Sequence, residues 1–316
     1  MKRVFMFAAA CLFAASSFAQ YPGKAIRLVV PFPAGSATDT VARIIGQSVS
    51  AAVGQPVVVD NKAGADGAIA GAEVAKSAPD GYTLFLATNS PMAVAPAMKK
   101  IPPYDPVADF TPISDIGRYT FFLYINAETP IRTFKELVAY AKANPGKLNY
   151  ATGNTTGIVS FAQMNSLAGI DMTHVPYKGE PQAITDIVGG RVQLLWATPT
   201  TGLSHVKDGK LRALATNLKA RSNLLPDVPT MAEVGIPQYS VVSWAALYAP
   251  AKLPRELQLR LNKEFTDAMK RPDVAAQLDK QAFQVTGSTP EELGAFTKAQ
   301  YEAYRAILKS VGMQPE

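Results

Sequence analysis

The stretch IRLVVPFPAGSATD (residues 26–39) places a nearly continuous apolar run directly before a loop of small residues. Such a run is typical of a strand that is buried on both faces of a sheet. Beyond the loop, apolar residues recur at helical spacing from Val41 to Val49, which predicts a helix. The stretch therefore predicts a strand, a turn and a helix, the repeating unit of a parallel α/β sheet.

The same alternation continues along the chain. The expected strands are 26–32, 57–59, 83–87, 121–125, 149–152, 175–177, 192–196 and 241–248. The expected helices are 68–76, 134–143, one from the loop 153–157 through Leu167, 180–188, and two long amphipathic helices at 257–269 and about 290–311. Two α/β units with trailing helices fit either two sequential domains or two lobes between which the chain crosses twice. The pattern alone leaves both arrangements open.

The first twenty residues have the pattern of an export signal. Lys2 and Arg3 precede an apolar stretch, Val4–Ala15, that is too short to cross a bilayer, and Ser17-Phe18-Ala19 supplies the small residues of a signal-peptidase site. A buried N-terminal helix is the alternative interpretation. We predict a cleavable signal peptide at 1–19, which directs the chain to the periplasm and takes the single cysteine of the sequence, Cys11, with it.

Composition and missing motifs exclude several functions. The 316 residues are 48% hydrophobic, enough for a full core, and one cysteine with two histidines argues against disulfide scaffolds and metal centres. The net charge of +6 comes from scattered Lys and Arg without a basic run, so nucleic acid is not an expected partner. The G-x-S-x-G, P-loop, H-E-x-x-H and G-x-G-x-x-G patterns are missing, and we expect no catalytic residue, cofactor or metal.

Three loops share one design, in which a predicted strand ends, small and hydroxyl residues follow, and a helix begins. They are 33–39, 87–90 and 152–157. Small residues allow a ligand to approach backbone N–H groups, and a helix N-terminus carries partial positive charge, so such loops can hold a carboxylate. Taken singly, each loop is equally explained by helix capping. Several of them at the strand ends of one α/β protein favour a ligand site.

The sequence resembles the periplasmic solute-binding receptors of tripartite tricarboxylate transporters, the Bug or TctC-like proteins. The resemblance rests on six motifs in register: YPGKAIRLVVPFPAGSATDTVAR (21–43), VVVDNKAGADGAIA (57–70), APDGYTL (78–84), HVPYKG (174–179), PDVPTMAEVG (226–235) and WAALYAPAKLP (244–254). It implies a type II periplasmic-binding-protein fold, with two α/β lobes joined by two crossover strands around a ligand cleft. Lobe one would comprise 20–122 plus 236–316, and lobe two 123–235.

The resemblance also implies a function. Such receptors are not enzymes; they capture small organic acids and deliver them to the two membrane subunits of the transporter. We expect a monomer that binds a di- or tricarboxylate or an aromatic acid, with terephthalate or a citrate- or adipate-like acid as examples. A receptor that presents its closed form to a membrane signalling protein is the alternative, and an enzyme on the same scaffold is not favoured.

The family's first loop usually reads PFxAGGxxD, so Gly35, Thr38 and Asp39 match it, whereas Ser36 replaces the second glycine and adds a hydroxyl. Asp66 stands where the family usually has glycine; because it would repel an anion, we expect it to point to solvent. Two aromatic residues, Phe32 and Trp196, stand at the ends of predicted strands. Each could equally belong to the core of a lobe or form a platform for the ligand. The predicted ligand-binding residues are Phe32, Gly35, Ser36, Ala37, Thr38, Asp39, Thr88, Asn89, Asn154, Thr155, Thr156 and Thr198.

Overall fold

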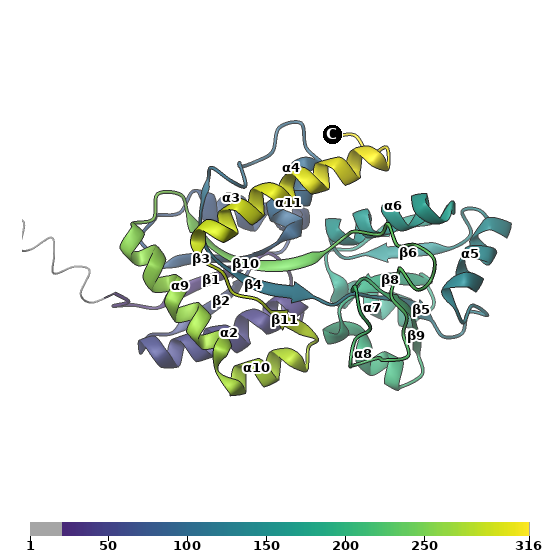
Figure 1. Ribbon diagram of the computed structural model, residues 1–316, viewed down its shortest axis with the longest axis horizontal. Coiled ribbons are helices and arrows are strands. Elements are labelled where there is room, and N and C mark those ends of the chain that lie inside the picture. Colours follow the sequence, from purple (N-terminus) through teal and green to yellow (C-terminus); the bar gives the residue numbers. More distant parts are fainter. Residues whose placement is uncertain (1–20, 316) are drawn as a thin grey trace, which may run out of the picture.

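The computed structural model describes residues 21–315, which form two lobes, each built on one mixed sheet covered by helices on both faces (Figure 1). The predicted signal peptide, 1–19, lies outside the described residues. Within 21–315, no helix is both long enough and apolar enough to span a bilayer. The architecture is the two-lobed α/β fold expected from the resemblance.

The first lobe contains a six-stranded sheet in the order β11-β4-β10-β3-β1-β2. Its strands are β1 (Ile26–Val30), β2 (Val57–Asn61), β3 (Thr83–Thr88), β4 (Phe110–Tyr119), β10 (Ser243–Pro250) and β11 (Phe283–Val285). β1 is parallel to β2 and β3, so that Leu28 lies between Val59 and Leu84. β10 runs antiparallel to both β3 and β4, which makes the sheet mixed rather than wholly parallel.

Helices sandwich this first sheet. One face is covered by α2 (Ala37–Val53), α9 (Arg255–Lys270) and α10 (Pro272–Asp279), whose apolar side chains pack on inward residues of β1 and β3. The other face carries η1 (Ala65–Gly67), α3 (Ala68–Ala75), η2 (Ser90–Val94), α4 (Ala95–Ala97) and α11 (Pro290–Ser310). Alternate residues of β1 point to opposite faces, and its four apolar residues are all buried, as the apolar run predicts, whereas Arg27 is half-buried.

The second lobe contains a five-stranded sheet in the order β7-β6-β8-β5-β9. Its strands are β5 (Phe122–Asn126), β6 (Asn149–Thr152), β7 (Thr173–Pro176), β8 (Leu194–Ala197) and β9 (Leu211–Thr216). Its helices are α5 (Phe134–Ala143), α6 (Thr155–Ala168), α7 (Glu180–Val188) and α8 (Pro199–Lys207). β6 is parallel to β7 and β8, and β5 is antiparallel to β8 and β9, which repeats the mixed pattern of the first sheet.

The chain passes between the two sheets twice. β4 of the first sheet ends at Tyr119 and β5 of the second begins at Phe122, and the return path runs from Thr216 to Ser243. Because β10 and β11 rejoin the first sheet, the two sequential domains allowed by the sequence pattern are excluded. The position within 217–242 at which one lobe ends stays a prediction.

Several boundaries and elements differ from the prediction. β1 ends at Val30 rather than at residue 32, because Pro31 has no amide hydrogen to extend the ladder. The strands expected at 175–177, 192–196 and 241–248 are shifted, to the bounds of β7, β8 and β10. The pattern did not predict the elements β4, β9, β11, α8 and α10.

Candidate functional site

A small cavity lies between the lobes, where strands of both sheets end. Its volume is about 30 Å³, room for roughly two water molecules. Its walls come from both lobes and consist of Phe32, Ser36, Ala37, Thr38, Thr88, Tyr119, Phe121, Gly153, Asn154, Thr156, Glu180, Thr198 and Ser243. Eight of the predicted binding residues are in this set; Gly35, Asp39, Asn89 and Thr155 are not. Ligand contact by any of them stays a prediction.

The first-lobe wall is the N-terminus of helix α2. Ser36 is the N-cap, and its Oγ accepts a hydrogen bond from the Asp39 amide at 3.3 Å. Gly35 turns the chain before the cap with φ +80°, a conformation that favours glycine. Beside the cap, the Tyr119 hydroxyl donates to Thr38 Oγ1 at 3.1 Å. Capping and cavity lining therefore coincide in Ser36, so its two interpretations from sequence are compatible.

Asp39 is buried but faces its own helix rather than the cavity. Its carboxylate accepts a hydrogen bond from the Gly35 amide at 3.0 Å and pairs with the Arg43 guanidinium at 2.8 Å. Burial acts to raise the pKa of Asp39, but the bonds from Arg43 and Gly35 outweigh it and hold the pKa below its ordinary value. The residue therefore stays ionised and fixes the shape of the loop.

The second-lobe wall is the N-terminus of helix α6. Asn154 is the N-cap, and its Oδ1 accepts from the Gly157 amide at 3.0 Å. The hydroxyls that follow meet the first lobe: Asn89 Nδ2 donates to Thr156 Oγ1 at 2.7 Å, and Ser90 Oγ lies 2.5 Å from Thr155 Oγ1. Asn89 and Thr155 are thus inter-lobe contacts in this structure, placed behind the cavity wall.

Glu180 is a cavity residue that the sequence analysis missed. It begins helix α7, is 7% exposed, and its Oε2 accepts hydrogen bonds from the Thr198 amide (3.1 Å), Thr198 Oγ1 (2.8 Å) and Thr201 Oγ1 (3.0 Å). Burial raises the pKa of Glu180, and these hydrogen bonds offset the rise only in part. An acid in a first helical turn is ordinarily explained by the helix dipole, so nothing in its pattern singled it out.

The backbone around Glu180 leaves no spare volume. A Cβ placed on Gly153 would lie 2.5 Å from the Glu180 amide nitrogen, and one on Gly179 would lie 3.0 Å from the Pro33 ring. The loop after β6 therefore packs on the start of α7, and the start of α7 packs on the first-lobe loop. Thr198, predicted as a site residue, completes this corner as the N-cap of α8.

The expectation that Asp66 points to solvent is wrong. Asp66 accepts a hydrogen bond from the Thr155 amide of the opposite lobe, and burial raises its pKa above the ordinary value, against the lowering effects of that bond and of Lys99. Its backbone has φ 55° and ψ 31°, the left-handed region in which the family's usual glycine is favoured. The carboxylate avoids the cavity by reaching the N-terminus of α6 across the lobe boundary.

The aromatic residues at strand ends divide between core and cavity. Trp196 is 1% exposed and stacks on Tyr239 with ring centroids 5.7 Å apart, so it belongs to the core. Phe32 lines the cavity together with Phe121. His174 lies 2.6 Å from Thr152 Oγ1 on the neighbouring strand. Among residues 21–315, no group of acidic, histidine or cysteine side chains is placed to hold a metal.

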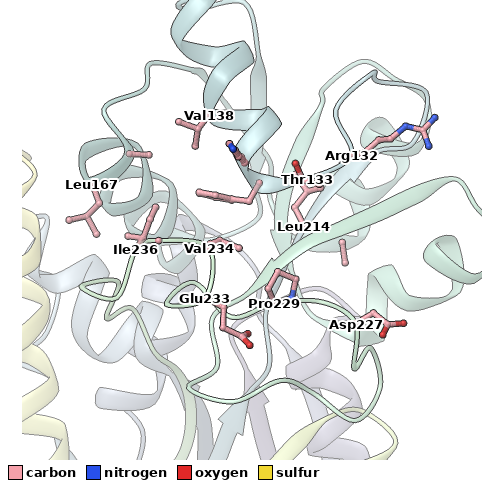
Figure 2. Close-up of a pocket in the computed structure, with 15 residues that line it drawn as sticks. Arg132, Thr133, Val138, Leu167, Leu214, Asp227, Pro229, Glu233, Val234 and Ile236 are labelled. Atoms are coloured by element: carbon pink, nitrogen blue, oxygen red, sulfur yellow. The ribbon is translucent and has the colours of Figure 1, made fainter.

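A larger hollow of about 740 Å³ lies on the second lobe, away from the strand ends that face the first lobe. Figure 2 shows side chains of α5, of the end of α6 and of the segment 227–236 around it, with Arg132, Asp227 and Glu233 at its polar edge. In Figure 1, α5 lies at the end of the second lobe that is remote from the first. The inter-lobe cavity, by contrast, is lined by residues of both lobes, among them the N-caps of α2 and α6.

A family model described as "Tripartite tricarboxylate transporter family receptor" matches residues 41–313 of this chain. Among curated proteins, the chain is 34% identical to Protein BugT of Bordetella pertussis over 298 residues, which covers 92% of this chain and 90% of BugT.

Solved structures of the same kind superpose closely. A protein of R. palustris, solved with adipate, has a TM-score of 0.90 and 31% identity, and the match covers 94% of this chain and all of that one. MatC from Rhodopseudomonas palustris, with bound malate, has a TM-score of 0.86 and 28% identity, with 91% and 100% covered.

Proposed function

The chain belongs to the tripartite tricarboxylate transporter receptor family, and we propose on that premise that it captures a small organic carboxylate between its lobes. It then delivers the ligand to the membrane subunits of such a transporter. Export by the signal peptide 1–19 would place this monomeric receptor in the periplasm. The family is one of receptors, and we propose that this chain likewise binds its ligand without chemical change.

One observation supports the carboxylate most strongly: two helix N-termini, of α2 and α6, border one cavity from opposite lobes. Each offers backbone N–H groups and the positive end of a helix dipole, and the caps Ser36 and Asn154 add polar side chains. Hydrogen bonds to a charged group contribute about 1.5–3 kcal/mol each. A few of them, with apolar contact to Phe32 and Phe121, reach the roughly −8 kcal/mol of a micromolar complex.

The ligand we propose is a dicarboxylate of modest length. Adipate and malate, found in two solved relatives, are both flexible dicarboxylates. The aromatic side chains of Phe32 and Phe121 extend the proposal to a flat acid such as terephthalate. The cavity of about 30 Å³ is too small for any of these acids, so the lobes must part to admit one and close again on it.

Calorimetry tests the proposal. The protein spanning residues 21–316, unfolded and refolded to remove any copurified ligand, is titrated with adipate, malate, citrate and terephthalate. Adipamide serves as the matched uncharged control for adipate. We expect at least one acid to bind with micromolar affinity and adipamide not to bind. If none of the four acids binds, the carboxylate proposal is wrong.

A further inference from the structure

The inter-lobe cavity holds a buried acid, which is unexpected in a site proposed for anions. Glu180 lines the cavity from the N-terminus of α7 and is almost fully removed from solvent. Among the described residues that line this cavity, none is a lysine or arginine. A carboxylate ligand would therefore share this cavity with Glu180. The inference below rests on the proposed function and explains how the two acids can bind side by side.

The hydrogen bonds of Glu180 determine where a proton can reside. The backbone amide of Thr198 can only donate, so Oε2 must act as an acceptor. Both threonine hydroxyls, of Thr198 and Thr201, also lie on Oε2. All three of these bonds are to Oε2, and none of the residues 21–315 makes a hydrogen bond to Oε1. A proton on this side chain therefore sits on Oε1, the oxygen left free for a ligand.

The charged and titratable groups around Glu180 do not neutralise it. Tyr119 on β4 and Tyr124 on β5 face it, and burial raises the pKa of both phenols, so they stay neutral. Asp39 is turned toward Arg43, and Asp66 is bonded to the N-terminus of α6. An ionised Glu180 and a ligand carboxylate would thus be like charges in a cavity from which water is largely excluded, an arrangement that favours protonation of one of them.

We propose that Glu180 binds the ligand as a neutral carboxylic acid, donating its Oε1 hydrogen to a carboxylate oxygen of the ligand. One proton passes from solvent to Oε1 when the complex forms, and it returns to solvent on release. The site then selects acids that carry no cationic group, because a ligand ammonium would require the ionised form of Glu180. Glu180 is thereby a specificity-determining residue of the receptor.

Proton uptake can be measured directly on the wild-type protein. The tightest of adipate, malate, citrate and terephthalate is titrated at one pH in phosphate and in Tris, whose ionisation enthalpies differ, and the difference in observed heat gives the number of protons bound. We expect about one proton above the pKa of Glu180 and none well below it. The apparent affinity should fall by up to tenfold per pH unit in the upper range.

Two variants identify the titrating group. Glu180→Gln keeps an acceptor for Thr198 and presents a permanent N–H donor to the ligand. Ligand binding by this variant should take up no proton, and its affinity should not change with pH. The variant should therefore bind more weakly than wild type at low pH and more tightly at high pH. Asp66→Asn, which removes the other nearby carboxyl of raised pKa, should keep the proton uptake.

Each outcome decides between the alternatives. Dicarboxylate binding without proton uptake in the wild type overturns this inference and leaves the proposed function intact. The inference is equally wrong if Asp66→Asn abolishes the uptake, or if aspartate binds more tightly than malate and loses its binding in Glu180→Gln. Failure of the wild type to bind any of the four acids overturns the proposed function and this inference together. The wild-type titration decides even if Glu180→Gln does not fold, which its thermal melt will show.

Discussion

Ser36 caps helix α2 and also lines the inter-lobe cavity, so one side chain serves both stability and the proposed site. The sequence presented these as competing interpretations because either one explains a serine before a helix. In the structure the two roles use different parts of the hydroxyl. Its oxygen accepts a hydrogen bond from the Asp39 amide, and its hydrogen remains available to donate to a ligand. Stability and affinity can therefore be measured separately at this position.

Substitutions of Ser36 should separate capping from binding. Ser36→Ala removes the cap and should lower the free energy of unfolding by about 0.5–2 kcal/mol, whereas Ser36→Gly should cost only a few tenths. Both variants lose the hydroxyl, so both should bind the ligand about 10- to 150-fold more weakly, because a hydrogen bond to a charged group contributes about 1.5–3 kcal/mol. Urea unfolding and calorimetry measure the two effects. Wild-type affinity in both variants would show that the hydroxyl does not touch the ligand.

Glu180 should make stability depend on pH. Its folded-state pKa is raised, mainly by burial, so its stabilising contribution is complete below the unfolded-state pKa and is lost as pH rises through the folded-state pKa. Glu180→Gln does not titrate. The melting temperature of this variant relative to wild type should therefore increase from about pH 4 to about pH 8. Thermal melts of both proteins across that range measure this difference. Asp66 is present in both proteins, so its own titration does not affect the difference. A constant difference would contradict the raised pKa.

The residues predicted for the site show which signals a sequence contains. Ser36 and Asn154, which line the cavity, were predicted because each follows a strand and precedes a helix, a local pattern. Glu180 and the true position of Asp66 were not, because both depend on contacts across sequence distance: Glu180 with Thr198, and Asp66 with the other lobe. Local patterns place a helix N-terminus, but they do not place the partner that approaches it.

At the scale of elements, the burial of β1 can be predicted from its own sequence, whereas that of β4 cannot. β1 is apolar except for Arg27 and was predicted to within two residues. β4 contains Ser114 and Asp115, which are both buried. The Ser114 hydroxyl donates to the carbonyl of Ser288, near the far end of the chain, and the Asp115 carboxylate pairs with Arg118 of the same strand at 2.7 Å. Its pairing with β10 also shifts register twice, so no regular alternation exists to be recognised. A strand that buries polar side chains and shifts its register shows no regular period in its own sequence.

The contact between the β6–α6 loop and the start of α7 is tight enough to test. In Gly153→Ala, the new Cβ would lie 2.5 Å from the Glu180 amide nitrogen and 2.6 Å from the Gly179 carbonyl carbon, so backbone must move. We expect a loss of about 1–3 kcal/mol in the free energy of unfolding, together with weaker ligand binding.

Helix α11 offers the matched control for that substitution. In Gly294→Ala, the nearest atom to the added Cβ is a Pro112 ring carbon at 3.6 Å, an ordinary contact. Replacing glycine by alanine within a helix should stabilise the protein by about 0.5–1 kcal/mol, with binding unchanged. Chemical unfolding of both variants compares them. Equal effects of the two substitutions would mean that the loop around Gly153 adapts freely.

At the scale of the whole molecule, direct bonds between the lobes enclose the cavity. Ser90 and Thr155, Asn89 and Thr156, and Asp66 with the Thr155 amide meet on one side, and Thr200 donates to Gln281 at 2.9 Å elsewhere. The resemblance predicted two lobes around a cleft, and that architecture is found. Which side chains touch across the cleft depends on how two rigid bodies approach, and no periodicity within either lobe contains that information.

Locking the lobes together should stop ligand exchange. Ser90 Oγ and Thr155 Oγ1 are 2.5 Å apart, which brings the two Cβ atoms near the roughly 4 Å separation that a disulfide spans. Cys11 is the only cysteine of the sequence, so Ser90→Cys/Thr155→Cys in a protein starting at residue 21 has no competing thiol. Oxidised without ligand, it should hold a cavity of about 30 Å³ that excludes adipate, and dithiothreitol should restore binding.

The single variants Ser90→Cys and Thr155→Cys supply the control, because each loses the same hydroxyl contact but cannot form the bond. Both should bind in oxidising and in reducing buffer alike. Stopped-flow fluorescence, with Trp196 and Trp244 as intrinsic reporters, measures the association rate in each state. If the oxidised double variant binds as fast as its reduced form, then the ligand enters without separation of the lobes. The cavity would in that case have to widen by side-chain movement alone, at Phe32 and Phe121, rather than by the opening of a hinge.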